Sequence, residues 1–138
     1  VSALTLACGD GGTEPDIIID GSYELVSVDG QALPHTQDYG EGYLDRVNSG
    51  GMVISGTAVT YTLSISMSVN GGESWVDEEF SATGTLTRSG NSLSLTFPPA
   101  QNPGIDPSAV WSGTWDGADR LTLQIVADTY TNVLVMDR

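Results

Sequence analysis

The clearest pattern in the chain is an unbroken alternation of apolar and hydroxyl side chains over residues 58–69. The apolar positions share one parity and are Val59, Tyr61, Leu63, Ile65, Met67 and Val69, while Ser and Thr hold the positions between them. Because successive side chains of a strand point to opposite faces, this pattern predicts a β-strand with one buried face and one solvent-exposed face. Leu63 and Ile65 are therefore expected to be buried, and Ser64 and Ser66 are expected to face solvent.

Eight strands are expected from residue 22 onward, most of them joined by short turns. They cover residues 22–28, 52–55, 58–69, 75–88, 92–97, 110–115, 121–125 and 131–137. Asp29-Gly30 and Asn70-Gly71-Gly72 are turn signals, because their residues tolerate positive φ. Gly84 predicts a bulge that interrupts the fourth of these strands near residues 82–84. Residues 31–51 show no clean period and are expected to form a long loop with one helical turn.

An even number of antiparallel strands joined by hairpins favours a closed sheet, because closure removes unpaired edges. We therefore predict an all-β fold: an antiparallel, eight-stranded, up-and-down barrel formed by residues 21–138, with a two-sheet sandwich as the alternative. The side chains expected to face inward are medium to large, including Tyr61 and Phe97. Close packing of such side chains predicts a mostly filled core, with at most a shallow apolar cup near Trp111 and Trp115.

The charge of the chain narrows the choice of partners and chemistries. Acidic residues outnumber basic ones by 18 to 4, lysine is absent, and the formal net charge is −14. Nucleic acid is therefore excluded as an expected partner, because phosphate binding needs a basic patch. A single cysteine excludes a disulfide within the chain, and a single histidine, His35, leaves little for a catalytic triad or a histidine metal site. We expect no enzymatic activity, no metal and no cofactor.

The N-terminal segment differs in composition from the rest of the chain. A short apolar run ends at Leu6-Ala7-Cys8, and a glycine-rich stretch follows. This segment resembles the end of a bacterial lipoprotein signal peptide, with Leu6-Ala7-Cys8 as the core of the lipobox. The resemblance implies that residues 1–20 are a signal-peptide remnant and a flexible tether, that Cys8 is lipidated, and that the protein is exported and anchored at the bacterial outer membrane or cell surface. The alternative is a buried N-terminal strand with a cysteine in the core.

Gly21-Ser22-Tyr23, at the start of the first expected strand, resembles the Gly-x-Trp opening of lipocalins with tyrosine in place of tryptophan. Arg138, just after the last expected strand, is similar to the arginine that packs over the first-strand aromatic residue in that superfamily. Residues 21–34 also look like small lipocalin-like bacterial lipoproteins of unknown function. The resemblance implies a barrel and a structural pair formed by Tyr23 and Arg138.

Two functions are compatible with a lipid-anchored β-barrel protein. The first is binding of a small apolar or amphipathic ligand, with Trp111, Trp115 and Tyr61 as the candidate ligand-binding residues. Trp111 and Trp115 share a parity with Gly113, so their rings are expected to face one side and to form either a stacking surface or part of the core. The second function is that of a structural subunit in an extracellular assembly or filament, in which residues 1–20 mediate self-association by adding a strand to a neighbouring sheet.

Lipidation at Cys8 can be tested directly by intact-mass measurement on protein extracted from native membranes. We expect a mature chain that begins at Cys8 and has the added mass of a lipid group. A mature chain that retains residues 1–7 together with a free thiol would contradict lipidation and would favour assembly through the N-terminal segment.

Overall fold

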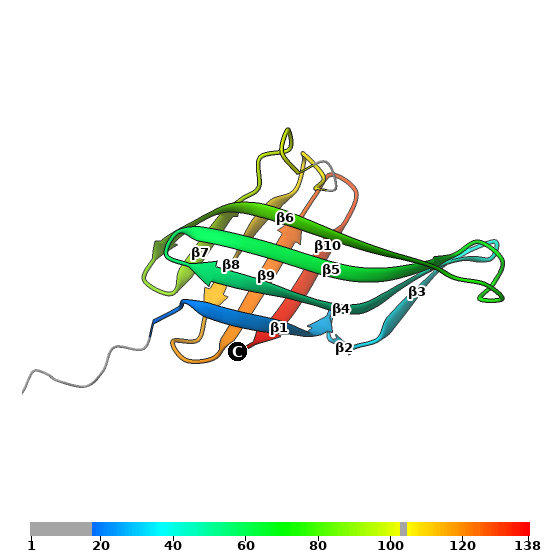
Figure 1. Ribbon diagram of the computed structural model, residues 1–138, viewed down its shortest axis with the longest axis horizontal. Coiled ribbons are helices and arrows are strands. Elements are labelled where there is room, and N and C mark those ends of the chain that lie inside the picture. Colours follow the sequence, from blue (N-terminus) through cyan, green and yellow to red (C-terminus); the bar gives the residue numbers. More distant parts are fainter. Residues whose placement is uncertain (1–17, 103–104) are drawn as a thin grey trace, which may run out of the picture.

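The computed structural model describes residues 18–102 and 105–138, and all of its regular elements are β-strands (Figure 1). In chain order the strands are β1 (Gly21–Val28), β2 (Gln31–Ala32), β3 (His35–Gly40), β4 (Tyr43–Ser55), β5 (Ala58–Ser68), β6 (Val76–Ser89), β7 (Ser92–Thr96), β8 (Val110–Trp115), β9 (Arg120–Val126) and β10 (Thr131–Asp137). Within these described ranges, no helix is long and apolar enough to cross a membrane.

The sheet closes on itself through β1 and β4. Its strand order is β2-β1-β10-β9-β8-β7-β6-β5-β4-β3, and an additional pairing joins residues 21–24 of β1 to residues 51–54 of β4. All pairings are antiparallel, so β1 and β4 to β10 form a closed up-and-down barrel of eight strands with two extra strands. The predicted fold class is confirmed, and the barrel is consistent with a lipocalin-like fold.

Residues 31–51 were expected to form a loop, and this prediction is wrong. They form β2, β3 and the first part of β4. The pairing of β4 with β5 shifts register between Val47 and Ser49, which marks a bulge. A bulge exchanges the two faces of a strand, so Val47 faces inward before it and Met52 faces inward after it. Inward-facing and outward-facing residues therefore alternate on each side of the bulge, but the inward-facing parity changes at the bulge.

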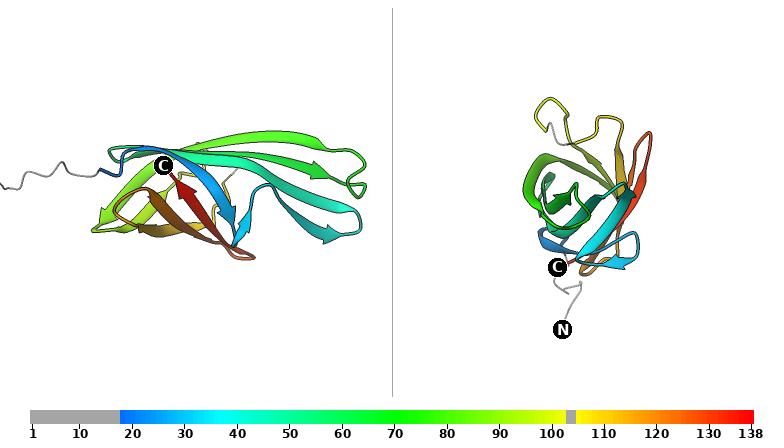
Figure 2. Two further views of the ribbon diagram at one scale, coloured as in Figure 1. Left: turned by 90° about the horizontal axis from the view of Figure 1, so that it is seen from below. Right: turned by 90° about the vertical axis from the view of Figure 1, so that its right-hand side faces the viewer.

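Three strands extend well beyond the barrel. β4, β5 and β6 have 13, 11 and 14 residues, whereas the other barrel strands have 5 to 8. Together with β3 they form a four-stranded projecting sheet, made of β3 and residues 43–48, 64–68 and 76–80 (Figures 1 and 2). The projecting sheet lengthens one wall of the barrel at one end.

The expected interruption of β6 near Gly84 is absent from the structure. β6 pairs with β5 without a register shift from Thr85 to Val76. A Cβ atom placed on Gly84 would lie only 2.2 Å from the Thr96 carbonyl oxygen and 2.8 Å from Phe97. The glycine therefore serves the close approach of β7 to β6 rather than a bulge.

Alternating apolar side chains of the barrel strands form the core. Leu121 and Leu123 on β9 have no exposed surface, and neither does Met136 on the neighbouring β10. The core also includes Met52 and Val59, which come from the other side of the barrel. Tight burial of such side chains stabilises a fold by roughly 1.5–3 kcal/mol each, so these positions account for much of the stability of the barrel.

Ser66 is buried, which contradicts its predicted solvent exposure. Its hydroxyl donates to the Asp77 carboxylate at 2.5 Å and accepts from the Asn48 amide at 2.8 Å. Arg46 donates to Asn48 at 3.0 Å and stacks over the Trp75 ring at 4.3 Å. The outer face of the projecting sheet is thus a polar network, and the arginine and the indole pack together beside it.

The contrast between Ser66 and Ser64 gives a stability test. Replacing Ser66 with alanine leaves Asn48 and Asp77 without their shared partner, and we expect this to lower the free energy of unfolding by about 1–2 kcal/mol. Ser64→Ala removes no hydrogen bond between the described residues and should change stability by less than about 0.5 kcal/mol. Urea denaturation followed by fluorescence measures both variants. Equal losses would show that the network adds nothing to stability.

Candidate functional site

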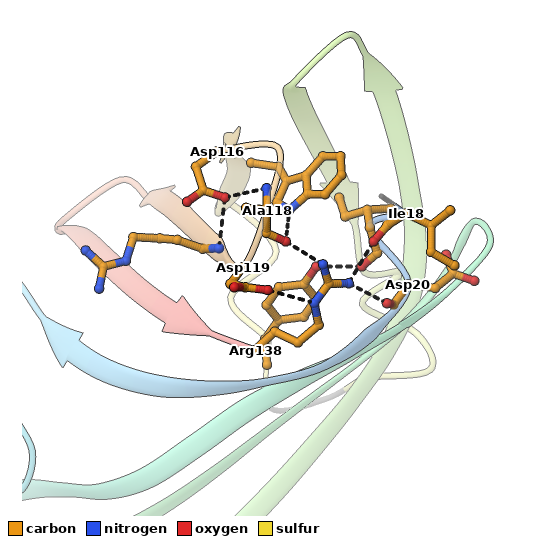
Figure 3. Close-up of polar contacts among 10 residues, drawn as sticks. Ile18, Asp20, Asp116, Ala118, Asp119 and Arg138 are labelled. Atoms are coloured by element: carbon orange, nitrogen blue, oxygen red, sulfur yellow. Dashed lines mark hydrogen bonds and ion pairs between the residues drawn. The ribbon is translucent and has the colours of Figure 1, made fainter. Parts of the chain in front are cut away.

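One end of the barrel is closed by Arg138, which follows β10 (Figure 3). Its Nη1 donates to the carbonyl oxygens of Ile18 and Asp20, both at 2.7 Å, and its Nη2 donates to the carbonyl oxygen of Ala118. Its Nε lies 3.5 Å from the Asp119 carboxylate. One guanidinium thereby joins the segment before β1 to the turn between β8 and β9.

Two buried aromatic residues lie beneath this arginine. The guanidinium lies 5.2 Å from the centre of the Tyr23 ring, and the Tyr23 hydroxyl donates to the Ile19 carbonyl oxygen at 2.6 Å. The Trp115 indole nitrogen donates to the Ala118 carbonyl oxygen at 3.2 Å. Burial raises the pKa of Tyr23, so the ring stays neutral. We call this the closed end of the barrel.

The opposite end is hollow. A cavity of about 700 Å³ opens there, between the projecting sheet and the loops that join β1 to β2, β7 to β8 and β9 to β10. We call this the open end. Its inner wall is largely apolar and includes Val47, Leu63, Ile65, Phe80, Ile125 and Leu134.

Aromatic side chains form the inner limit of the cavity. Tyr61 and Trp111 line it, and their ring centroids lie 5.0 Å apart in an edge-to-face arrangement. Phe97 packs against Trp111 at 4.8 Å, and Phe80 packs against Tyr61 at 5.9 Å. Burial raises the pKa of Tyr61, so this residue remains a neutral phenol. Trp111 is 5% exposed, and its indole N–H has no hydrogen-bond partner among the described residues.

Polar groups occupy the rim formed by the loops. The Asp29 carboxylate accepts from the backbone N–H of Val133 at 2.7 Å and from the Asn132 amide at 2.8 Å. The Asp106 carboxylate accepts from both the backbone N–H and the hydroxyl of Ser108, each at 2.8 Å, and these bonds lower the pKa of Asp106. These hydrogen bonds hold both carboxylates in place at the mouth of the cavity.

The projecting sheet adds a second polar group to the cavity wall. His35, Gln37 and Tyr39 of β3 and Asp45 of β4 line the cavity. Burial and the neighbouring Asp45 carboxylate raise the pKa of Tyr39. One buried oxygen of Asp45, Oδ1, has no hydrogen-bond partner in the part of the chain that the structure describes. The Oδ1 atom of Asp45 therefore differs from the Oδ1 atoms of Asp29 and Asp106, which accept hydrogen bonds from backbone N–H groups.

The structure separates the three residues that the sequence grouped as ligand-binding candidates. Tyr61 and Trp111 line the cavity, but Trp115 lies at the closed end. Trp111 and Trp115 do share a parity of β8, yet four residues of strand place them about 13 Å apart. The expected mostly filled core with a shallow cup is therefore wrong in size, since the cavity has a volume of about 700 Å³, and of the two tryptophans only Trp111 lines it. Tyr23 and Arg138 lie together at the closed end, and Cys8 lies outside the described residues.

Sequence reasoning missed the contribution of β3 and β4 to the cavity. Tyr39, Asp45 and Val47 fall in the segment that was expected to be a loop. Tyr43, Asp45 and Val47 share one parity, which is a strand signal, but the charged Asp45 interrupts the apolar pattern of that face. Within the described ranges, no group of three or more acidic, His or Cys side chains is placed to hold a metal ion.

No family model matches the chain, and no match was found among curated protein sequences.

Arg138 can be compared with Arg120, because each forms one ion pair near the closed end. Arg138→Gln removes hydrogen bonds to three carbonyl oxygens and the contact with Tyr23, and we expect a loss of about 2–3 kcal/mol in the free energy of unfolding. Arg120→Gln removes an ion pair with Asp137 that is exposed to solvent and screened by it, so it should lower stability far less than Arg138→Gln. Thermal and urea unfolding of both variants would measure the two losses of stability. Similar losses would mean that Arg138 acts only as a surface charge.

Proposed function

We propose that the barrel binds a small amphipathic ligand in its open cavity. The observation that supports this most directly is the cavity itself, because 700 Å³ falls within the usual range for small-molecule sites, about 300–1,000 Å³. A ligand-binding barrel is also what the resemblance to lipocalin-like proteins implies.

The distribution of polarity supports an amphipathic ligand rather than a purely apolar one. The inner wall is made of aliphatic and aromatic side chains, and the rim has carboxylates, amides and hydroxyls. A molecule with an apolar body and a polar end would match both surfaces. The indole N–H of Trp111 offers one further donor, which a ligand oxygen or nitrogen could accept once the side chains at the inner wall adjust.

We favour binding over catalysis because the cavity lacks a matched pair of reactive groups. His35 lines it, but no hydrogen bond connects His35 to a hydroxyl or a carboxylate within the described residues. At the rim, the Ser108 hydroxyl donates to the Asp106 carboxylate, and among the described residues no hydrogen bond joins this pair to a histidine.

We further propose that the protein is exported and held at a bacterial membrane by a lipid on Cys8. The described chain begins with Ile18 at the closed end, where Arg138 binds its carbonyl oxygen. A tether that leaves from this end would direct the open end away from the membrane, toward the surrounding medium. This orientation supports capture of a ligand from solution rather than from the anchoring bilayer.

Ligand binding can be tested with 11-bromo-1-undecanol, a neutral amphipath whose bromine quenches tryptophan fluorescence at short range. We expect saturable quenching in the unchanged protein and in Trp115→Phe, because Trp115 lies outside the cavity. Trp111→Phe should lose most of the saturable quenching, because Trp111 lines the inner wall.

The two tryptophan variants control for each other, since both remove one buried indole. Circular dichroism confirms that each variant is folded before titration. Absence of saturable quenching in the folded unchanged protein, or its loss in Trp115→Phe alone, would contradict binding in this cavity.

A further inference from the structure

The charged side chains that line the cavity are almost all acidic. Asp29, Asp45 and Asp106 contribute carboxylates, and His35 is the only side chain in the described lining that could carry a positive charge. The surrounding protein adds to this field, because its formal net charge is −14. A ligand with a negative head group would therefore be repelled, and one with a positive head group would be attracted.

All four arginines are engaged away from the cavity, and the chain has no lysine. Arg46 stacks over Trp75 on the outer face of the projecting sheet, and Arg88 lies 5.1 Å from the Trp115 ring. Arg120 pairs with Asp137, and Arg138 closes the opposite end. No arginine lines the cavity, so a bound carboxylate or phosphate would have no arginine or lysine to neutralise it.

Asp45 is the carboxylate best placed to receive a cation. Its Oδ1 atom is buried and lacks a hydrogen-bond partner among the described residues, and burying a polar atom without a partner is costly. Asp29 and Asp106 instead accept hydrogen bonds from neighbouring backbone and side-chain groups. Tyr39 lines the same wall, and its hydroxyl lies beside the Asp45 carboxylate.

The register of the strands places Asp45 and the inner wall of the cavity far enough apart for an extended ligand to lie between them. Asp45 pairs with Met67 of β5, and Tyr61 lies six residues earlier on that strand. Six strand residues span about 20 Å, and Leu63 and Ile65 line the cavity between these two levels. A ligand could thus place its charge near Asp45 and its apolar chain along β5 toward Trp111.

We propose that the ligand is a hydrophobic amine or a related cationic amphipath, whose positive group pairs with Asp45 beside Tyr39 while its apolar part lies against Leu63, Ile65 and Trp111. This inference rests on the proposed function and adds the charge of the ligand to it. It excludes fatty acids and other anionic lipids as preferred ligands.

Three probes with the same alkyl chain test the charge preference: dodecylamine, 1-dodecanol and dodecanoate, each titrated at pH 7 below its micellar concentration. At this pH the amine is protonated and the carboxylic acid is ionised, because their ordinary pKa values lie near 10 and 4. We expect the amine to bind about tenfold more tightly than the alcohol, and the acid more weakly than the alcohol. Added salt should reduce the preference for the amine.

Asp45→Asn provides the residue-level test, because it removes the charge and keeps the shape of the side chain. We expect it to weaken dodecylamine binding about tenfold, to the level of dodecanol, and to leave dodecanol binding unchanged. Glu79→Gln is the matched control: Glu79 is an exposed carboxylate on β6 that pairs with Ser64, on the face opposite to the cavity-lining Leu63 and Ile65, and its loss changes the net charge equally. The control should keep the preference for the amine.

The outcomes separate this inference from the proposed function. If dodecanol binds saturably but the amine binds no more tightly, or dodecanoate binds best, the charge preference is wrong and ligand binding stands. If Asp45→Asn and Glu79→Gln reduce amine binding equally, the assignment to Asp45 is wrong, because only net charge matters. If none of the probes binds to the folded protein, the proposed function fails and this inference fails with it.

Discussion

The pairing of β1 with β4 is the contact on which the rest of the structure depends. It closes the barrel through only four residues of each strand, 21–24 and 51–54. Gly51 makes the approach possible, because a Cβ atom there would lie 2.6 Å from the Tyr23 carbonyl oxygen. Since closure uses only the last part of β4, the first part remains available to pair with β3 and to continue past the barrel. The same short contact thus gives one closed sheet and, beyond it, the wall of an open cavity.

The barrel could be predicted from the sequence because most of its strands keep a single parity and end at residues that favour turns. Asp29 adopts φ 52° and Gly30 φ 80°, as their turn signal implies. The projecting sheet could not be predicted, for two physical reasons. The bulge after Val47 exchanges the two faces of β4 and so interrupts its period-two pattern. In addition, Arg46, Asn48 and Ser66 form a partly buried hydrogen-bond network, although polar side chains such as these predict a solvent-exposed face. Leu63 and Ile65 face inward as expected, yet they are only half-buried because they line a cavity.

The scarcity of basic residues links stability to ligand selection. The acidic chain has only four basic residues, all arginines. Each arginine makes a contact that joins two parts of the barrel or of its ends. Arg138 alone joins the segment before β1 to the turn between β8 and β9. Because these cations are committed to structural contacts, the open end is left with an acidic rim. The charge that we infer for the ligand is therefore a consequence of how the fold uses its few positive charges.

Gly113 allows close packing of β8 against β9 between the filled and the open halves of the barrel. It lies between Trp111 and Trp115 on β8, and a Cβ atom there would lie 2.2 Å from the Thr122 carbonyl oxygen and 2.9 Å from Leu123. The missing side chain lets β9 approach closely and lets the fully buried Leu123 occupy the centre of the barrel. Trp115 then packs toward the closed end, and Trp111 packs with Tyr61 and Phe97 at the inner limit of the cavity. A larger side chain at position 113 would clash with the Thr122 carbonyl oxygen and compete with Leu123 for space, so close packing of β8 and β9 requires this glycine.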